Sequence, residues 1–162
     1  MRLRSLLLTV PFVLGIANAN TSEIIYNKLE GMPISESVEI PAGKSLVFLS
    51  GKVPAVINQD APAGSLEAYG DTEAQTISVL EQIKENLARL DLTMEDVVKM
   101  QVFLVGGEET DGFMDFKGFM NGYTKFFDAE KTLKLPARSA FQVDKLALPA
   151  WRVEIEVTAV RP

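Results

Sequence analysis

The sequence predicts a two-layer α+β domain, in which two helices cover one face of a mixed β-sheet. The first observation is the order of the predicted elements between residues 37 and 162: strand, strand, helix, strand, helix, strand, strand. The second is a helical apolar stripe over Asp71 to Leu90, and the third is alternating polarity over Val97 to Leu104. We expect the other sheet face to carry apolar residues without cover, which indicates a partner or a second copy of the chain.

The two strands that open the domain are predicted at Ser37 to Ile40 and Ser45 to Ser50, with a turn between them. The residues before them, 20–36, are polar with little periodicity, so we expect a loosely ordered N-terminal arm. The segment from Gly51 to Gly70 is rich in Gly, Pro, Asn and Asp, which predicts a long loop.

The two helices follow from their apolar spacing. In the first, Thr72 and Gln75 fit a capping box with Thr72 as the N-cap. Its expected stripe consists of Ala74, Ile77, Leu80, Ile83, Leu87 and Leu90. The second helix is predicted over Phe113 to Phe127, with a buried set of Phe116, Phe119, Met120, Tyr123 and Phe127. The last two strands are predicted at Ala137 to Val143 and Trp151 to Val160.

The N-terminal segment has the pattern of a secretory signal peptide. Arg2 and Arg4 precede an apolar run over residues 6–16, and an A-x-A cleavage pattern ends at Ala19. The run is too short to span a bilayer comfortably, so we expect cleavage and no membrane attachment afterwards. The sequence therefore predicts a periplasmic or secreted protein with a signal peptide at residues 1–19.

Composition narrows the possible chemistry. The chain of 162 residues has a formal charge of −6, which becomes −8 without the two arginines of the signal segment. Such an acidic chain repels phosphate backbones, so we expect no nucleic-acid partner. It contains neither histidine nor cysteine, which leaves Arg, Glu, Ser, Tyr, Lys and the backbone for chemistry and rules out disulfides.

Arg138 is the candidate binding residue, because it opens a strand in a mostly apolar context. A guanidinium grips a carboxylate through two parallel hydrogen bonds. Composition and spacing alone favour a structural ion pair with Glu154 or Glu156, which share one face of the last strand with Arg152. The alternative is an anchor for an acidic small molecule, with a glutamate nearby to hold water.

The block Leu135-Pro136-Ala137-Arg138-Ser139, together with the strand over residues 153–160, resembles the C-terminal motif of the RidA/YjgF family. Ser50-Gly51-Lys52-Val53-Pro54 resembles that family's Ser-Gly-x-x-Pro turn. Residues 75–90, 96–105 and 115–127 match its first helix, central strand and second helix in order. The resemblance covers most of the chain from about residue 45 onward.

The resemblance implies a chorismate-mutase-like fold and a homotrimer with sites in the clefts between subunits. It implies an imine deaminase that hydrolyses 2-imino acids and their enamine tautomers to 2-oxo acids and ammonia, without a cofactor or metal. Arg138 would hold the carboxylate of the small-molecule imino or keto acid, and Glu154 would activate the water. The other positions implied in substrate binding are Ser50, Gly51, Ser139, Ala140 and Tyr123.

The chain also departs from the family pattern. Ala140 stands where a cysteine is common, and Met120 aligns with the family's helix asparagine, so that Asn121 lies one position late. The family's N-terminal Gly-Pro-Tyr segment is not recognisable, which leaves Tyr26 as a candidate substitute. Three other functions stay open: a non-catalytic module that binds small carboxylates, a ribonuclease and a structural or chaperone-like trimer. The negative charge and the lack of histidine argue against the ribonuclease.

Overall fold

In the computed structural model, which describes residues 22–132 and 134–162, six strands form one mixed sheet with helices on one side. The strands are β1 (Ile25–Lys28), β2 (Ser35–Glu39), β3 (Leu46–Lys52), β4 (Val97–Val105), β5 (Ala137–Val143) and β6 (Val153–Val160). The helices are α1 (Leu66–Tyr69), α2 (Thr72–Ala88) and α3 (Phe116–Tyr123), with short 3-10 turns at Met94–Asp96 and Glu108–Thr110. The predicted α+β class is confirmed.

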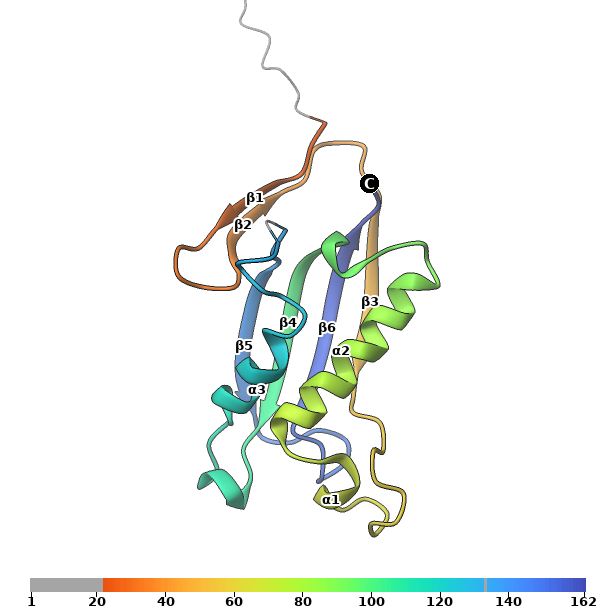
Figure 1. The fold of residues 1–162 in the computed structure, drawn as a ribbon, viewed down its shortest axis with the longest axis vertical. Coiled ribbons are helices and arrows are strands. Elements are labelled where there is room, and N and C mark those ends of the chain that lie inside the picture. Colours follow the sequence, from red (N-terminus) through yellow and green to blue (C-terminus); the bar gives the residue numbers. More distant parts are fainter. Residues whose placement is uncertain (1–21, 133) are drawn as a thin grey trace, which may run out of the picture.

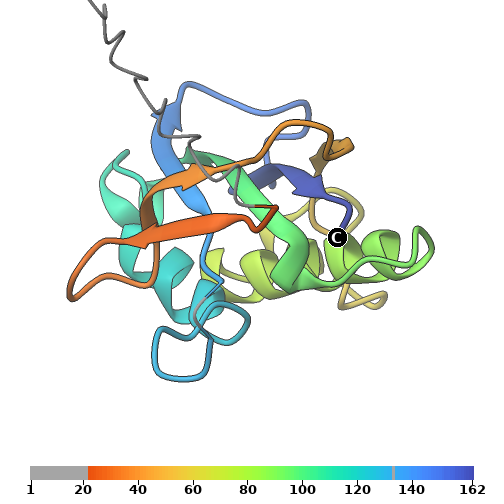
Figure 2. The same cartoon turned by 90° about the horizontal axis from the view of Figure 1, so that it is seen from above.

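The sheet order is β1-β2-β5-β4-β6-β3, with β5 parallel to both of its neighbours and every other pair antiparallel. Figure 1 shows α2 and α3 lying across the central strands, and Figure 2, seen from above, shows both helices on the same side of the sheet. Among the described residues, no segment forms a second helical layer on the other side. The expectation of one bare sheet face is therefore confirmed for the part of the chain that the structure covers.

The core lies between the two helices and the central strands. Alternate residues of β4 and β6 face the helices and are almost fully buried, and their neighbours face the open side. They pack against apolar side chains of α2 and α3, and the buried contributors include Met100, Val102, Leu104, Val153, Ile155, Leu80, Ile83, Leu87, Phe119, Tyr123 and Phe127. The alternation predicted for β4 is confirmed, because one face of the strand is excluded from water.

The start of α2 differs from the prediction by one residue. Asp71 is the N-cap, and its side chain accepts a hydrogen bond of 2.8 Å from the Ala74 amide. The predicted capping box is therefore wrong, and Gln75 has another role. Its buried amide donates to the carbonyls of Gly70 and Ala150 and accepts from the Arg152 amide. A polar side chain can be buried here because its donors and acceptor all find partners.

The N-terminal segment differs from the expected loose arm. Residues 25–28 form β1, which pairs antiparallel with β2, and β2 begins at Ser35. The side chains of this ribbon are mostly exposed, so backbone pairing and the bonds of Asn27 to Ser37 and Glu39 support it in place of core burial. A short exposed strand has little hydrophobic periodicity, which is why its sequence gave no strand signal.

Two other boundaries differ from expectation. The second helix spans eight residues, because Asp115 caps it and accepts a hydrogen bond from the Gly118 amide. Phe113, predicted inside that helix, is 72% exposed in the preceding loop. The expected long loop contains the short helix α1, whose Ala68 and Tyr69 pack beside Ala150 and Trp151. The predicted signal peptide, residues 1–19, lies outside the described residues, and no described helix is long and apolar enough to span a bilayer.

Candidate functional site

Arg138 lies on the helix-covered side of β5. It pairs in register with Met100, whose side chain belongs to the core between sheet and helices. Since side chains alternate along a strand, Arg138 and Ala140 face the helices and Ser139 faces the open side. Arg138 is half-buried, so its guanidinium is partly withdrawn from water.

Three aromatic rings of α3 hold the guanidinium in place. Its central carbon lies 4.2 Å from the centre of the Tyr123 ring, 5.0 Å from Phe119 and 5.9 Å from Phe116. Cation–π contacts of this kind favour a fixed position over a freely moving side chain. Burial lowers the pKa of Arg138, and burial also raises the pKa of Tyr123, so that ring stays a neutral phenol. The Tyr123 hydroxyl donates to the Pro33 carbonyl at 2.9 Å.

Arg138 has no carboxylate partner among residues 22–132 and 134–162. Its hydrogen bond runs from Nη1 to the Met120 sulfur at 3.4 Å, and thioether sulfur is a weak acceptor. None of its nitrogens is both fully buried and unpartnered, so the remaining donors of the guanidinium reach solvent. The ion pair with Glu154 or Glu156 that composition favours is therefore absent within the described chain. We call Arg138, Phe116, Phe119, Met120 and Tyr123 the arginine cluster.

Glu154 lies on the uncovered face of the sheet. It alternates with Val153 and Ile155, which are both fully buried under the helices. Its carboxylate lies directly over Gly51, where an added Cβ would collide with the carboxylate oxygen. Gly51 follows Ser50 at an irregularity in the pairing of β3 with β6. We call Glu154, Gly51 and Ser50 the glutamate cluster.

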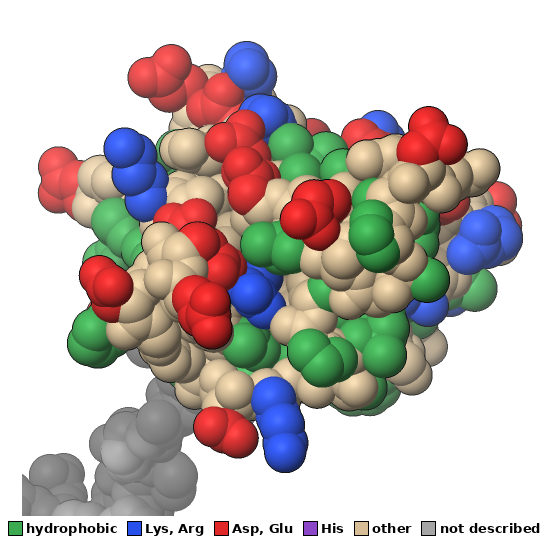
Figure 3. Space-filling view, turned by 90° about the horizontal axis from the view of Figure 1, so that it is seen from below, with side chains coloured by type: hydrophobic (Ala, Val, Ile, Leu, Met, Phe, Trp, Pro, Cys, Tyr) green, Lys and Arg blue, Asp and Glu red, His purple; other side chains and the backbone are tan. Residues whose placement is uncertain are grey.

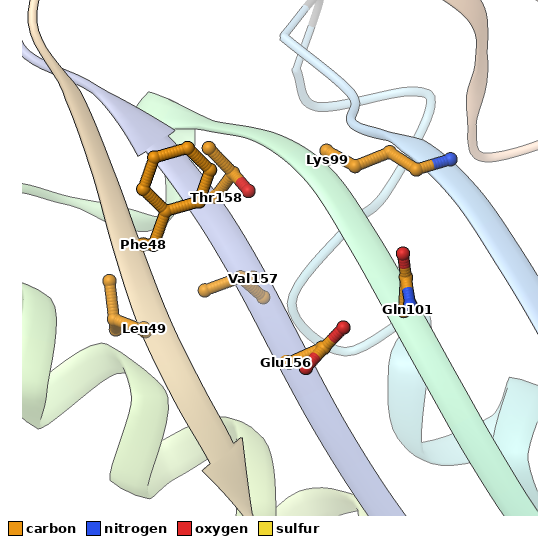
Figure 4. Close-up of a pocket in the computed structure, with 7 residues that line it drawn as sticks. All are labelled: Phe48, Leu49, Lys99, Gln101, Glu156, Val157 and Thr158. Carbon is orange, nitrogen blue, oxygen red and sulfur yellow. The ribbon is translucent and has the colours of Figure 1, made fainter.

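A small hollow of about 120 Å³ continues this uncovered face beside the glutamate cluster. Figure 4 shows its side chains rising from β3, β4 and β6, with Phe48 and Thr158 at one end and Glu156 beside Gln101 at the other. The hollow also includes Lys99, whose amine donates to the Ser139 hydroxyl at 3.4 Å. Ser139 therefore belongs to the uncovered face and does not join Arg138.

The two clusters lie on opposite faces of one chain. Arg138 pairs with Met100 of β4, which pairs with Val157 of β6, three residues from Glu154. Two strand spacings and three residues along a strand each amount to about 10 Å. The sheet itself separates the side chains, so one chain cannot place both groups on one small molecule. A site that uses both residues requires two copies of the chain.

The remaining expected residues divide between the two sides. Ala140 shares the helix-covered face with Arg138, and Tyr123 lies beneath the guanidinium. Tyr26 is on β1, where its hydroxyl contacts the Glu95 carbonyl at 3.3 Å. Burial and the carboxylates of Asp96 and Glu95 raise the Tyr26 pKa to about 12. The prediction that Tyr26 replaces the family tyrosine stays untested.

Arg152, predicted on the same strand face as Glu154 and Glu156, has its partner outside that strand. Its Nε donates to Glu109 at 2.7 Å, and its Nη1 donates to the Pro149 carbonyl. This pair fixes the loop after β4 to the start of β6 and lowers the pKa of Glu109. Figure 3 shows the end of the molecule that carries α1. On this face acidic side chains are scattered among hydrophobic ones, and the basic side chains form no stripe.

Sequence reasoning missed the role of the α3 side chains around Arg138. The spacing of Phe116, Phe119 and Tyr123 predicts a buried helix face, and that prediction holds for Phe119 and Tyr123. Nothing in that spacing indicates that the same face carries a cation. The alternation of side chains along β5 could have revealed it, because Arg138 alternates with residues that face away from the helices.

Comparisons with known proteins agree with this architecture. The family model described as Endoribonuclease L-PSP matches residues 33–161. Protein DfrA of Myxococcus xanthus is 36% identical over 129 residues, which is 79% of this chain and 85% of that protein. The 3-aminoacrylate deaminase RutC of Acinetobacter baylyi is 31% identical over 80% of this chain and 92% of its own length.

Solved structures show the same fold. A Rid-family protein from Yersinia pestis has a TM-score of 0.63 at 25% identity, covering 85% of this chain and 98% of that one. Escherichia coli TdcF with bound serine has a TM-score of 0.55 at 29% identity, covering 81% of this chain and 90% of that one. The matched residues, the curated relatives and the common fold together show that the chain belongs to the Endoribonuclease L-PSP family, also called the RidA/YjgF family.

Proposed function

We propose that this protein is a hydrolase that deaminates reactive 2-imino acids and their enamine tautomers to 2-oxo acids and ammonia. The observation that carries the proposal is Arg138, a guanidinium held on aromatic rings without a carboxylate of its own in the described chain. A fixed and unpaired arginine fits a ligand carboxylate. The relative RutC is named for 3-aminoacrylate, an enamine that carries a carboxylate, which supports this chemical class.

The proposed reaction uses Arg138 for binding and Glu154 for water. Arg138 donates two parallel hydrogen bonds to the substrate carboxylate. Glu154 takes a proton from water as the water oxygen bonds to the C=N carbon, the π electron pair moves to nitrogen, and Glu154 passes the proton to that nitrogen. In the second step the hydroxyl of the tetrahedral carbon gives its proton to the amine through Glu154, the C–N bond breaks, and a carbonyl and ammonia are released. The Gly51 backbone lies beside Glu154, and it and the preceding residue Ser50 supply hydrogen bonds to the substrate.

We also propose that the active site lies between copies of the chain in a homotrimer. Two observations support this arrangement: Arg138 and Glu154 lie on opposite sheet faces, and β2 pairs with β5 only at Ser35 and Ala137. Beyond that pair, the described residues leave the outer edge of β5 free. A contact between the uncovered face of one copy and this edge of the next is heterologous, and it generates a ring when the rotation between copies closes. Export after cleavage at Ala19 is part of the proposal.

The test follows the decay of imines made by an amino-acid oxidase. Residues 20–162 should accelerate the decay, and Arg138→Ala should weaken substrate binding by about 1.5–3 kcal/mol, because a charged hydrogen-bond partner is lost. Arg89→Ala is the matched control, because Arg89 is exposed at the end of α2, and it should behave as wild type. Full activity in Arg138→Ala would contradict the proposed role of Arg138 in binding the substrate carboxylate. No acceleration of any imine by the wild type would overturn the deaminase proposal.

A second candidate is a non-catalytic protein that binds small carboxylates. The arginine cluster favours it, because one chain completes that cluster without Glu154. Ligand binding by such a protein would require Arg138 and would not depend on the carboxylate of Glu154. Ligand binding without hydrolysis in the wild type would establish this candidate.

A further inference from the structure

We propose that Met120 makes the site selective for imino acids with large apolar side chains; this rests on the deaminase function proposed above. Met120 is half-buried on α3, and its sulfur lies 3.4 Å from Nη1 of Arg138. Thioether sulfur is polarisable and a weak acceptor, so it contacts the cation without satisfying it. The guanidinium therefore stays available to a bound carboxylate, and the Met120 side chain lies next to that carboxylate.

The other side chains around the guanidinium are also apolar. Phe116 is 39% exposed and reaches solvent beside Arg138, so its ring forms part of the accessible surface of the arginine cluster. Ala140 shares the face of β5 with Arg138, about 7 Å along the strand. The Tyr123 hydroxyl, the nearest polar group on the rings, already donates to Pro33. The part of the site that the arginine cluster forms therefore offers carbon and sulfur to a substrate side chain.

The one amide next to Met120 points elsewhere. Asn121 is exposed, and its side chain donates to Glu73 at 3.1 Å, in a group that also includes Lys125. It therefore offers no hydrogen bond to a ligand on Arg138. A polar or charged substrate side chain placed against Met120 and Phe116 would lose water without gaining a partner, which is unfavourable. An apolar side chain would gain binding free energy with each methylene that it buries.

The test compares imines derived from leucine and from alanine, which differ in apolar bulk alone. We expect kcat/KM of the wild type to be roughly tenfold or more higher for the leucine-derived imine. Tenfold is about the smallest preference that one additional methylene gives in an apolar pocket. Met120→Asn should bring this ratio close to one by losing activity on the leucine-derived imine. Met120→Leu is the matched control, because it keeps the apolar volume without the sulfur and should keep the ratio. Thermal unfolding of each variant checks that it is folded, and Met120→Ala replaces Met120→Asn if the latter is not.

The outcomes separate the inference from the function beneath it. A wild type that is active on both imines with a ratio near one would overturn the selectivity and leave the deaminase proposal standing. A folded Met120→Asn variant that keeps the wild-type ratio would overturn the role of Met120. A wild type that is inactive on every imine would overturn the deaminase proposal and the inference together.

Discussion

The two faces of the sheet are built from the same strands but differ in what lies over them. On the covered face, Val102, Ile155 and their neighbours are fully buried under α2 and α3. On the uncovered face, Phe48 is 75% exposed and Phe141 is 40% exposed, among Lys99, Gln101 and Glu156. Exposed aromatic side chains that gather on one sheet face are typical of a surface that meets a partner. The covered face therefore stabilises the single chain, and the uncovered face is suited to an interface.

The two candidate clusters follow the same division. Arg138 is on the covered side, where aromatic rings fix it, and Glu154 is on the uncovered side, against a glycine backbone. The chain positions each of these two side chains well, but it holds them on opposite sides of its sheet. The division explains how a chain without histidine or cysteine can supply a cation and a carboxylate that do not neutralise each other.

The largest expected effect is on the uncovered face. Glu154→Gln should lower the rate of imine hydrolysis by roughly a hundredfold to ten-thousandfold, because an amide cannot take the proton from water. Calorimetric titration with the 2-oxo acid product should still show binding, since Arg138 is unchanged. Glu156→Gln, on the same face two residues away, is the control and should keep most of the activity. Equal losses in the two variants would argue against a specific role for Glu154.

The next effect compares the stability of the two faces. Phe119→Ala should lower the free energy of unfolding by about 3–5 kcal/mol, because it leaves a cavity beside Tyr123 in the core. Phe48→Ala should change the stability of the dissociated chain by about 0.5 kcal/mol or less, and should lower apparent stability only where copies associate. Denaturant unfolding at several protein concentrations measures both. A large and concentration-independent loss in Phe48→Ala would contradict the interface assignment.

The smallest effect concerns the pair between Arg152 and Glu109. The pKa of Glu109 is lowered by its hydrogen bond to Arg152, so its stabilisation is present above the unfolded value of 4.5 and is lost as pH falls through the folded value. Because Glu109 is partly exposed, we expect about 1 kcal/mol or less. The difference in unfolding temperature between wild type and Glu109→Gln should therefore shrink as pH drops below 4.5. A difference independent of pH in that range would show that the charge of Glu109 contributes nothing.

Much of the fold could be predicted because its signals are periodic. The alternation of β4 follows directly from the pleat of a half-buried strand, and the predicted range of β5 is confirmed. The cap of α2 was misplaced because Asp71 and Thr72 are adjacent good N-caps, and only the hydrogen bond to Ala74 distinguishes them. β1 was missed because backbone pairing with β2 holds it without a buried face.

The candidate site was less predictable than the fold. Arg138 and Glu154 could be named from the motif, but their separation depends on strand order, which places β4 between β5 and β6. The partner of Arg152 was also hidden, because Glu109 is distant in sequence and lies in a 3-10 turn. Met120 could not be placed beside Arg138 until α3 was packed on β5. Interactions between distant segments are the ones that local patterns do not encode.

The most direct test of a shared site combines two inactive variants. Arg138→Ala and Glu154→Gln, each with a different affinity tag, are coexpressed, and assemblies that carry both tags are purified. If each site takes Arg138 from one copy and Glu154 from the next, every mixed trimer has one site in which both residues are intact, so these assemblies should recover about a third of the wild-type activity. Assemblies with both tags that are no more active than either variant alone, or the failure of the two variants to assemble, would contradict a site built from opposite faces of neighbouring copies.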